Sequence, residues 1–522
     1  MTAPRNHTFQ TKHGSPMSAS RQTDFERVLW PSCPSSASIR APKITMTDPA
    51  PKLPLREKIA YGVGDIANGL AVSSVAFWLL YYLTDVAGLP GTLAGIALMI
   101  GRAWDALIDP FIGWLSDKTE TKWGKRRPFL LFGAFTYSLT FFSLWVIPEF
   151  SDESSTFIYI TLAFIAFNTA LAFVFIPYTS LTAAMTSDYH ERTSLTGYRM
   201  TFSQLSYLLG GALPPFLVGA IISEPGKLFF EQLGVQSLFG DWAGTPRQAY
   251  FVIALGLSIL MSASLLFCFA GTRERVAGAV SAHVSANPFS YVTALARICR
   301  DNIAFRSSVL IKLFSTCATT LIGVNIPYYL SYVIGMPGQK TVVLSCLFLA
   351  AIATTPLWVV RARTHGKAET YRAAMMGYIV VLAALTLLPS HATPWIYPLA
   401  IAAGVFHSAA LMIPWSIIPD VVEYDELLFG SRREGLLYGG SAFAYKFASA
   451  FAIFLVGVIL DLVGYVPNQP QTAEAVLGIK LTITIAPAIL LGLSIWASTK
   501  YPLTPEKHRE ILSELSRRNA IG

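Results

Sequence analysis

The stretch LAGIALMIGRAWDALIDPFIGWL, residues 93–115, decides the fold. It is an apolar run of the length that crosses a bilayer as a helix, and it carries Arg102, Asp105 and Asp109. The two aspartates are four residues apart, just over one helical turn, so both carboxylates share one helix face. Each charge at bilayer depth costs at least about 2.5–3.5 kcal/mol. Two acids retained there predict a protein that handles ions or polar solutes.

The whole chain has the composition of a polytopic membrane protein. Of its 522 residues, 53% are hydrophobic and 13% are charged, whereas soluble proteins carry roughly 25% charged residues. The net charge of +8 is explained by basic loops facing anionic lipid, so we expect no nucleic-acid partner. The five cysteines and eight histidines show no metal-binding spacing. With no nucleotide-binding loop or nucleophile motif either, we expect neither an enzyme nor a bound cofactor.

Apolar segments recur along the chain between polar breaks, and they predict about twelve transmembrane helices. Backbone polar groups in lipid must be satisfied within the segment, which makes each span a helix. A longer polar connection divides the spans six and six, as expected for two pseudo-symmetric six-helix bundles. The predicted spans are 58–84, 90–115, 128–148, 156–184, 199–222, 248–270, 305–334, 341–361, 371–389, 394–419, 436–463 and 476–499.

These spans predict the domain organisation. Residues 1–54 are polar and rich in Ser, Pro and Thr, so we expect a disordered tail, although Met46 is an alternative start. The remaining predicted parts are an N-terminal bundle at 55–270, a cytoplasmic linker at 271–304, a C-terminal bundle at 305–500 and a cytoplasmic tail at 501–522.

Loop charges predict the orientation. Alternate loops are strongly basic, whereas the opposite set carries few basic residues and is comparatively acidic at Glu149, Asp152 and Glu153. The positive-inside rule therefore places both termini in the cytoplasm of a plasma or inner membrane. The basic loops contain Lys118, Lys122, Lys125, Arg126, Arg127, Arg192, Arg273, Arg275, Arg297, Arg300, Arg361, Arg363, Lys367, Arg432 and Arg433.

The loop GWLSDKTETKWGKRRPF, Gly113–Phe129, resembles the signature loop of the major facilitator superfamily. The resemblance implies the major facilitator fold and a gating role for Asp117, Arg126 and Arg127 rather than contact with substrate. The alternative is an ordinary positive-inside loop.

Further motifs resemble the melibiose-permease family, the glycoside–pentoside–hexuronide:cation symporters, over roughly residues 55–500. The order of the motifs is that of the family, which implies cation-coupled transport of a small solute by a protein expected to act as a monomer. The motifs are YGVGDIANGL (61–70), YYLTDVAGL (81–89), GRAWDALIDPFIGW (101–114), IPYTSL (176–181), HERTSLTGYR (190–199), PYYLSYVIG (327–335) and IPDVVEYDE (418–426).

The resemblance implies roles residue by residue. The helix-two acids match Asp105 and Asp109, which with the helix-eleven lysine, Lys446, would couple the cation. Arg199 on helix five and Lys446 would contact the substrate. On the cytoplasmic side, the resemblance implies an inner gate whose ion pairs break when the cavity opens inward; its remaining members are Asp420, Glu423 and Arg432.

Several family positions differ here. The helix-one acid that grips sugar hydroxyls is replaced by Gly69, although Asp65 lies one turn earlier and is our candidate substitute. The helix-four acid is Phe175, the tryptophan that stacks on the sugar is Thr179, and the asparagine between the helix-two acids is Ile108. The chain therefore lacks several oxygen ligands of a sodium site and the principal galactoside contacts.

These losses favour a proton over sodium as the coupling ion. Two carboxylates supply too few oxygens for a hard cation, and backbone carbonyls, a hydroxyl such as that of Thr84 or a repositioned Asp65 would have to help. A proton needs one carboxylate, and two neighbouring acids titrate as a coupled unit. Sodium coupling and uncoupled facilitation remain the alternatives.

Each candidate residue also has a structural interpretation. Arg102 and Asp105 could form a purely structural i,i+3 ion pair, Lys446 could snorkel, and Arg199 could anchor a helix end. Aromatic side chains could stack on sugar faces or pack in the core; those considered are Trp78, Tyr81, Tyr82, Trp104, Tyr198 and Tyr445. Of these we select Tyr198 and Tyr445 as candidate substrate contacts.

The sequence thus predicts a symporter for a sugar, a glycoside or a related polar organic solute, working by alternating access. One alternative is a sodium-coupled transporter of lysolipid-like cargo, since animal lysolipid symporters resemble this chain in keeping the helix-two acids and the helix-eleven lysine. An alternative of another class is a membrane sensor that binds a solute without transporting it.

Overall fold

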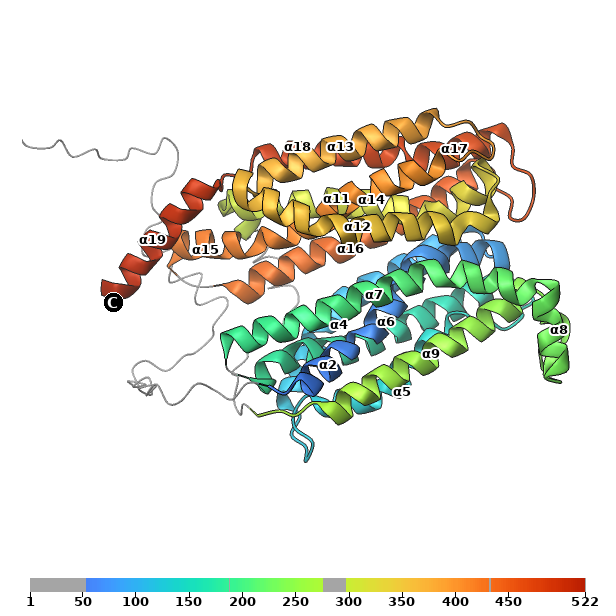
Figure 1. Ribbon diagram of the computed structural model, residues 1–522, viewed down its shortest axis with the longest axis horizontal. Helices are drawn as coiled ribbons and strands as arrows, with labels where there is room; N and C mark the ends of the chain where they lie inside the picture. Colours follow the sequence, from blue (N-terminus) through green and yellow to red (C-terminus); the bar gives the residue numbers. More distant parts are fainter. Residues whose placement is uncertain (1–52, 187, 276–296, 431–432, 522) are drawn as a thin grey trace, which may run out of the picture.

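The computed structural model describes residues 53–186, 188–275, 297–430 and 433–521. Within these ranges the chain is helical, without strands, and its only bridge joins Thr121 and Gly124. Figure 1 shows two helix bundles, one drawn in blue to light green and the other in yellow to red. Eleven helical segments in the described ranges are long and apolar enough to cross a membrane. The helix α5, with 17 residues, completes the twelve predicted spans.

The first bundle contains the first six spans. Aspartate side chains cap α6 and α7 at their N-termini: Asp152 accepts a hydrogen bond from the Ser155 backbone and Asp188 from that of Glu191. The elements are α2 (Leu55–Val63), α3 (Asp65–Ser74), η1 (Val75–Leu79), η2 (Tyr82–Val86), α4 (Gly91–Lys118), α5 (Arg127–Ser143), α6 (Glu153–Met185), α7 (Tyr189–Ile222), α8 (Glu224–Gln232), η3 (Gln236–Trp242) and α9 (Pro246–Gly271).

The second bundle contains the other six spans and a terminal helix, α19, in the segment predicted as a tail. The tail of residues 1–54 and the linker 271–304 lie largely outside the described residues, so their predicted character stays a prediction. The elements are α11 (Ile303–Tyr328), η4 (Tyr329–Val333), η5 (Pro337–Gln339), α12 (Lys340–His365), α13 (Lys367–Leu387), α14 (Ile396–Ser416), α15 (Ile418–Phe429), α16 (Glu434–Leu462), α17 (Ala473–Ile483), α18 (Ile485–Thr499) and α19 (Pro505–Ile521).

The bundles meet mainly through two helix pairs, α4 with α16 and α7 with α12. Glycines allow α4 and α16 to approach closely: a Cβ on Gly457 would lie 2.1 Å from the carbonyl oxygen of Gly91, and one on Gly95 would lie 3.0 Å from the Cα of Phe454. The carboxylate of Asp461 on α16 accepts hydrogen bonds of 2.9 and 2.7 Å from the backbone N–H groups of Gly91 and Thr92. The α16 acid therefore caps α4 across the bundle boundary.

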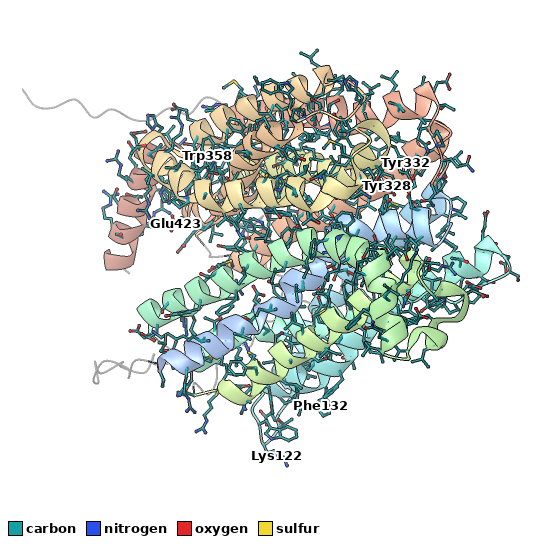
Figure 2. The ribbon with its side chains drawn as sticks, turned by 45° about the vertical axis from the view of Figure 1, so that its right-hand side comes forward. Lys122, Phe132, Tyr328, Tyr332, Trp358 and Glu423 are labelled. Atoms are coloured by element: carbon teal, nitrogen blue, oxygen red, sulfur yellow. The ribbon has the colours of Figure 1, made fainter. Side chains whose placement is uncertain are left out.

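The two ends of the molecule differ. We name them the α8 end and the α19 end after the helices that mark them in Figure 1. At the α8 end the two bundles lie close together, and toward the α19 end their ribbons diverge. In Figure 2, Tyr328 and Tyr332 lie toward the α8 end of the second bundle, and Glu423 lies toward the α19 end.

Candidate functional site

The structure brings Lys446 together with both α4 aspartates. Its amine lies 3.0 Å from Oδ2 of Asp105, forms a hydrogen-bonded ion pair with Asp109, and also donates to the backbone carbonyl of Asp105 at 3.3 Å. Lys446 stands on α16 and the acids on α4, so this triad joins the two bundles. A lysine that bridges two acids in another bundle is not snorkelling to the membrane surface.

The three side chains differ in exposure. Asp105 is 2% exposed, Lys446 18% and Asp109 34%. Because Asp109 faces α16, its exposed third opens into the space between the bundles rather than toward lipid. The ion-pair partner of Asp105 is Lys446 rather than Arg102, which lies over the ring of Phe164, 5.8 Å from its centre.

The charge of the triad defines its chemistry. Two carboxylates and one ammonium leave one negative charge, which one proton or one monovalent cation would neutralise. The same amine holds both acids, so the three groups respond to ion binding as a unit. Loss of one carboxylate charge would weaken the ionic contact between the bundles.

A second charged group lies within the first bundle. Asp65 on α3 is 3% exposed, and the positive charge of Arg199 on α7 acts on it. One Asp65 carboxylate oxygen has no hydrogen-bond partner among the described residues. No hydrogen bond or ion pair in the described part of the chain connects Arg199 to Lys446, so these two candidate substrate residues belong to separate groups.

The packing around Gly69 explains the missing helix-one acid. A Cβ on Gly69 would lie 2.0 Å from Oγ of Ser206 and 2.8 Å from the carbonyl oxygen of Ser203, both on α7. No side chain fits there without separating α3 from α7. Asp65 lies one turn away, and its carboxylate has an oxygen without a hydrogen-bond partner. It is therefore the acid of this helix that remains possible when position 69 must be glycine.

Tyr445 takes part in an aromatic group that the sequence analysis did not identify. Its ring lies 6.0 Å from that of Trp415 on α14, and the amine of Lys312 on α11 lies 3.1 Å from the centre of the Trp415 ring. Tyr198 is partly buried. The other aromatic candidates divide: Tyr82 and Trp78 are core residues that donate hydrogen bonds to backbone carbonyls, and Trp104 donates to Thr169.

The α8 end is closed by a polar cluster around Asp85. Tyr332 and Tyr465 of the second bundle both donate their hydroxyl protons to its Oδ1 atom, the latter at 2.7 Å. Asn468 donates to the Asp85 carbonyl oxygen at 2.7 Å. Thr84 donates to Asp85 Oδ2 and contacts the Tyr328 hydroxyl at 2.9 Å. The Thr84 hydroxyl thus belongs to this cluster rather than to the Asp105–Asp109 pair, where a sodium site would need it.

A cavity of about 640 Å³ lies at the same end, away from the triad. The residues predicted to couple the cation, Asp105, Asp109 and Lys446, are absent from its lining. Its lining includes Trp78, Tyr81, Asp85, Glu149, Arg247 and Lys340.

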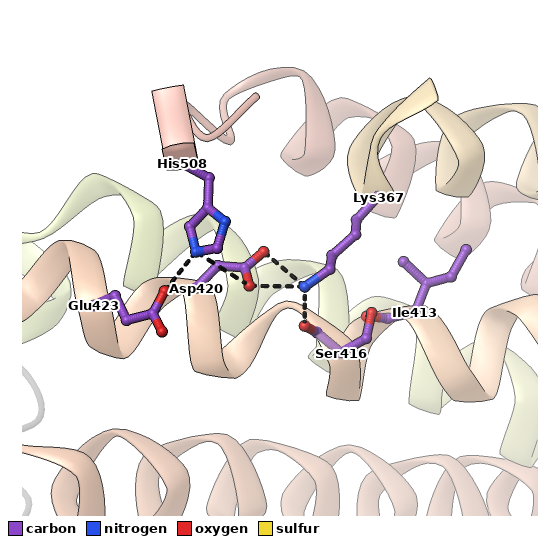
Figure 3. Close-up of polar contacts among 6 residues, drawn as sticks. All are labelled: Lys367, Ile413, Ser416, Asp420, Glu423 and His508. Carbon is purple, nitrogen blue, oxygen red and sulfur yellow. Dashed lines mark hydrogen bonds and ion pairs between the residues drawn. The ribbon is translucent and has the colours of Figure 1, made fainter. Parts of the chain in front are cut away.

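Two of the predicted gate acids lie together at the α19 end (Figure 3). Asp420 accepts hydrogen bonds of 2.7 and 2.8 Å from the Lys367 amine, and His508 contacts Glu423 at 2.5 Å and Asp420 at 3.8 Å. All four belong to the second bundle or to α19. The two gate acids are thus paired within the second half of the molecule in this arrangement.

The basic members of the predicted gate lie on the first bundle. The backbone N–H groups of Arg126 and Arg127 both donate to Glu274, and the Arg127 guanidinium donates to the Phe269 carbonyl oxygen at 2.7 Å. Arg432 lies outside the described residues, as does the side chain of Asp117.

Two groups escaped the sequence analysis for different reasons. Asp85 and Tyr332 lie in YYLTDVAGL (81–89) and PYYLSYVIG (327–335), two motifs that were noted only for their family resemblance. An aspartate and several tyrosines near the ends of predicted spans could have indicated a polar cluster there. Lys312 carried the same signal as Asp105, a charge inside an apolar span, but it was not considered.

Comparison with known proteins identifies the family. The family model described as "MFS/sugar transport protein" matches residues 60–505. The "Glucuronide carrier protein homolog" of Escherichia coli is 31% identical over 90% of this chain and 97% of its own. The "Sodium-dependent lysophosphatidylcholine symporter 1" of Gallus gallus is 27% identical and covers 88% of each chain.

A solved structure shares the fold. A bacterial homologue of the human lysosomal transporter Spinster, in an inward-facing and unoccupied conformation, aligns with a TM-score of 0.62 over 86% of this chain and 98% of its own, at 14% identity. This likeness confirms the twelve-helix architecture. Together with the family match, it shows that the chain belongs to the MFS/sugar transport family and is a multi-pass secondary transporter rather than an enzyme.

Proposed function

We propose that this protein is a proton-coupled symporter for a sugar, a glycoside or a related polar organic solute. The observation that carries the proposal is the bridge from Lys446 on α16 to Asp105 and Asp109 on α4. Transport proceeds by alternating access, with the two bundles rocking about a central site. The proposed mechanism needs a single chain, because both sides of this bridge come from one chain.

Protonation links the coupling ion to the movement. The triad carries one net negative charge, and a proton on either acid removes it. Lys446 then holds one carboxylate less firmly, and the ionic contact between α4 and α16 weakens. A solute that contacts Lys446 or the aromatic group beside it binds with a different affinity once the acid is protonated, so the binding of proton and solute is linked.

The surroundings of the acids support a proton over sodium. The position between them is Ile108, and Phe175 occupies the family's helix-four acid position. The Thr84 hydroxyl is engaged with Asp85 and Tyr328 instead. Neither Ile108 nor Phe175 supplies an oxygen to a hard cation, and the Thr84 hydroxyl is engaged elsewhere, whereas a proton needs only one carboxylate.

We infer that the α19 end faces the cytoplasm, which places both termini there. The basic loop between α4 and α5 and the clustered residues Lys367 and Arg433 support this orientation through the positive-inside rule. With the Asp85 cluster joining the bundles at the opposite end, the arrangement corresponds to an inward-facing state of a plasma or inner membrane transporter.

The first experiment identifies the solute. Purified protein is screened by thermal shift against sugars, glycosides and lysolipids at two pH values, with and without sodium. The best ligand is then added outside protein-containing liposomes, where proton symport predicts alkalinisation of the medium. Uptake that depends on sodium and leaves the pH unchanged would contradict the proposal.

The variant Asp109→Asn tests the coupling residue. It removes a protonatable group while keeping the shape of the side chain, so accumulation against a gradient should be abolished while exchange of solute persists. Glu510→Gln, an exposed acid on α19, is the matched control and should accumulate solute normally. Unchanged accumulation by Asp109→Asn would remove Asp109 from the coupling role.

A second candidate is sodium-coupled transport of lysolipid-like cargo. It is favoured by the avian relative named a sodium-dependent lysophosphatidylcholine symporter and by the apolar residues Ile108 and Phe175. In the same screen it predicts stabilisation by lysolipids that requires sodium, and none by sugars.

A further inference from the structure

Lys312 on α11 is a buried lysine that the proposed coupling triad does not use. It lies nine residues inside the helix and is 2% exposed. Its amine is 3.1 Å from the centre of the Trp415 ring and 5.6 Å from that of Tyr445. Among the described residues its amine forms no hydrogen bond and no ion pair, and the polar interactions found for it are those with the two aromatic faces.

An aromatic face is a weak partner for a charge held inside a membrane. Cation–π attraction holds an ammonium group in place but does not replace its lost hydration as a carboxylate does. Most charged residues in the middle of the spans have an opposite charge nearby: Lys446 has two acids, and Arg199 has Asp65. Lys312 and Arg102 both lack an ion-pair partner in the described part of the chain, and of the two only Lys312 is fully buried.

The balance of charge around Lys312 points the same way. The described residues place no acid within ion-pair distance of the Lys312 amine, whereas two acids face that of Lys446. An anionic solute would restore neutrality, whereas a neutral one would leave a positive charge uncompensated in a low-dielectric region.

The group lies beside the space between the bundles. Tyr445 precedes Lys446, which reaches across to α4, and the ring of Trp415 is 41% exposed. Trp415 lies inside the apolar span Ile396–Phe429, which continues beyond α14 through α15, and Tyr445 is adjacent to Lys446, so the group lies beside the triad. A solute between the bundles would therefore meet Lys312 and Lys446 together.

We propose that Lys312, Trp415 and Tyr445 form a subsite for a carboxylate group of the transported solute. The proposal rests on the proposed transport function and narrows the solute to an acidic sugar derivative. The amine forms a charge-assisted hydrogen bond with the carboxylate. The two rings hold the amine in position and exclude water from the contact, which strengthens it.

A matched pair of probes tests the subsite. 4-Nitrophenyl β-D-glucuronide and 4-nitrophenyl β-D-glucoside differ only in carrying a carboxylate or a hydroxymethyl group. Their dissociation constants are measured by calorimetry on the purified full chain at one fixed pH. The wild type should bind the glucuronide at least about tenfold more tightly than the glucoside, as expected for a hydrogen bond to a charged group.

Variants assign that preference to Lys312. Lys312→Met keeps the length of the side chain without its charge and should abolish the preference while leaving glucoside binding unchanged. Lys312→Arg should retain it. Lys340→Met is the matched control: Lys340 is also buried, with its amine 4.1 Å from the Tyr81 ring centre, but it lies at the α8 end. The control should keep the preference.

Each outcome decides the proposal. A preserved preference in Lys312→Met, an equal loss of affinity for both probes, or no binding of either probe by the wild type would overturn it. Binding of lysophosphatidylcholine that weakens in Lys312→Met, without a response to the glucuronide, would also overturn it in favour of a phosphate. Because binding is measured at fixed pH without a gradient, a failure of proton coupling leaves this result unaffected.

Discussion

Replacement of Lys446 by methionine tests whether the triad holds the bundles together, and it needs no knowledge of the substrate. The change removes the ammonium group and keeps most of the apolar side chain. Asp105, which is 2% exposed, then loses its ion-pair partner at 3.0 Å. Asp109 loses the same partner but is 34% exposed, so water compensates for part of its loss.

The expected cost follows from these exposures. At an effective dielectric constant of 20, two charges 3.0 Å apart attract by about 5 kcal/mol, and breaking one side of a buried pair costs about 3–5 kcal/mol. The half-exposed contact with Asp109 adds at most about 1 kcal/mol, as surface pairs do. We therefore expect Lys446→Met to lower the free energy of unfolding by about 3–5 kcal/mol.

The assay is unfolding by SDS titration in mixed micelles, followed by circular dichroism. The double variant Lys446→Met/Asp105→Asn removes the uncompensated buried charge and should recover most of the loss. Asp109→Asn combined with Lys446→Met should recover little, because Asp109 reaches water. A loss below about 1 kcal/mol, or equal recovery by both double variants, would refute the assignment of Asp105 as the buried member of the pair.

Two further variants examine the contacts that set the conformational equilibrium. Asp85→Asn removes the charge that accepts hydrogen bonds from Tyr332 and Tyr465. The loss of about 1.5–3 kcal/mol should shift the conformational population more than tenfold toward separation of the bundles at the α8 end. Spin labels on α8 and η5 should then lie farther apart, and unchanged distances would contradict a closing role for this cluster. Gly457→Ala places a Cβ 2.1 Å from the Gly91 carbonyl oxygen and should lower the free energy of unfolding in the SDS titration by about 1–3 kcal/mol through overpacking. In the control Gly492→Ala the Cβ meets open space, so the free energy should change little. Equal effects of the two variants would show that the close approach of α4 and α16 is unimportant.

The spans could be predicted from the sequence because hydropathy and length alone specify a helix in lipid. The predicted segment 436–463 corresponds to Glu434–Leu462, and 90–115 to Gly91–Lys118. Interruptions within spans were not predictable in the same way. The first span contains π-helical turns at Val75–Leu79 and Tyr82–Val86, of which the first packs against α11 of the second bundle. Such turns leave no mark on hydropathy.

In the candidate site, too, the sequence could indicate single residues, but it could not indicate their contacts. Asp105, Asp109 and Lys446 could be identified because charges in apolar runs are rare and costly, and family resemblance aligned them. Their pairing across the bundles needed the structure, since their separation in sequence exceeds three hundred residues. The gate acids were also recognised, but Lys367 and His508 as their partners were not, because each comes from a different element.

The position of the triad along α4 and α16 explains how a single proton could act on the whole molecule. The glycine contact at Gly457 and the Asp461 cap fix the two helices together at the α8 end. Lys446 lies eleven residues from Gly457, about 16 Å along the helix. An ionic contact at that distance from a tight contact resists rotation of one bundle against the other far better than the same contact beside the pivot. In the proposed mechanism, neutralising one of its acids therefore loosens the helix pair at a distance from the pivot, while the glycine contact keeps the bundles from separating.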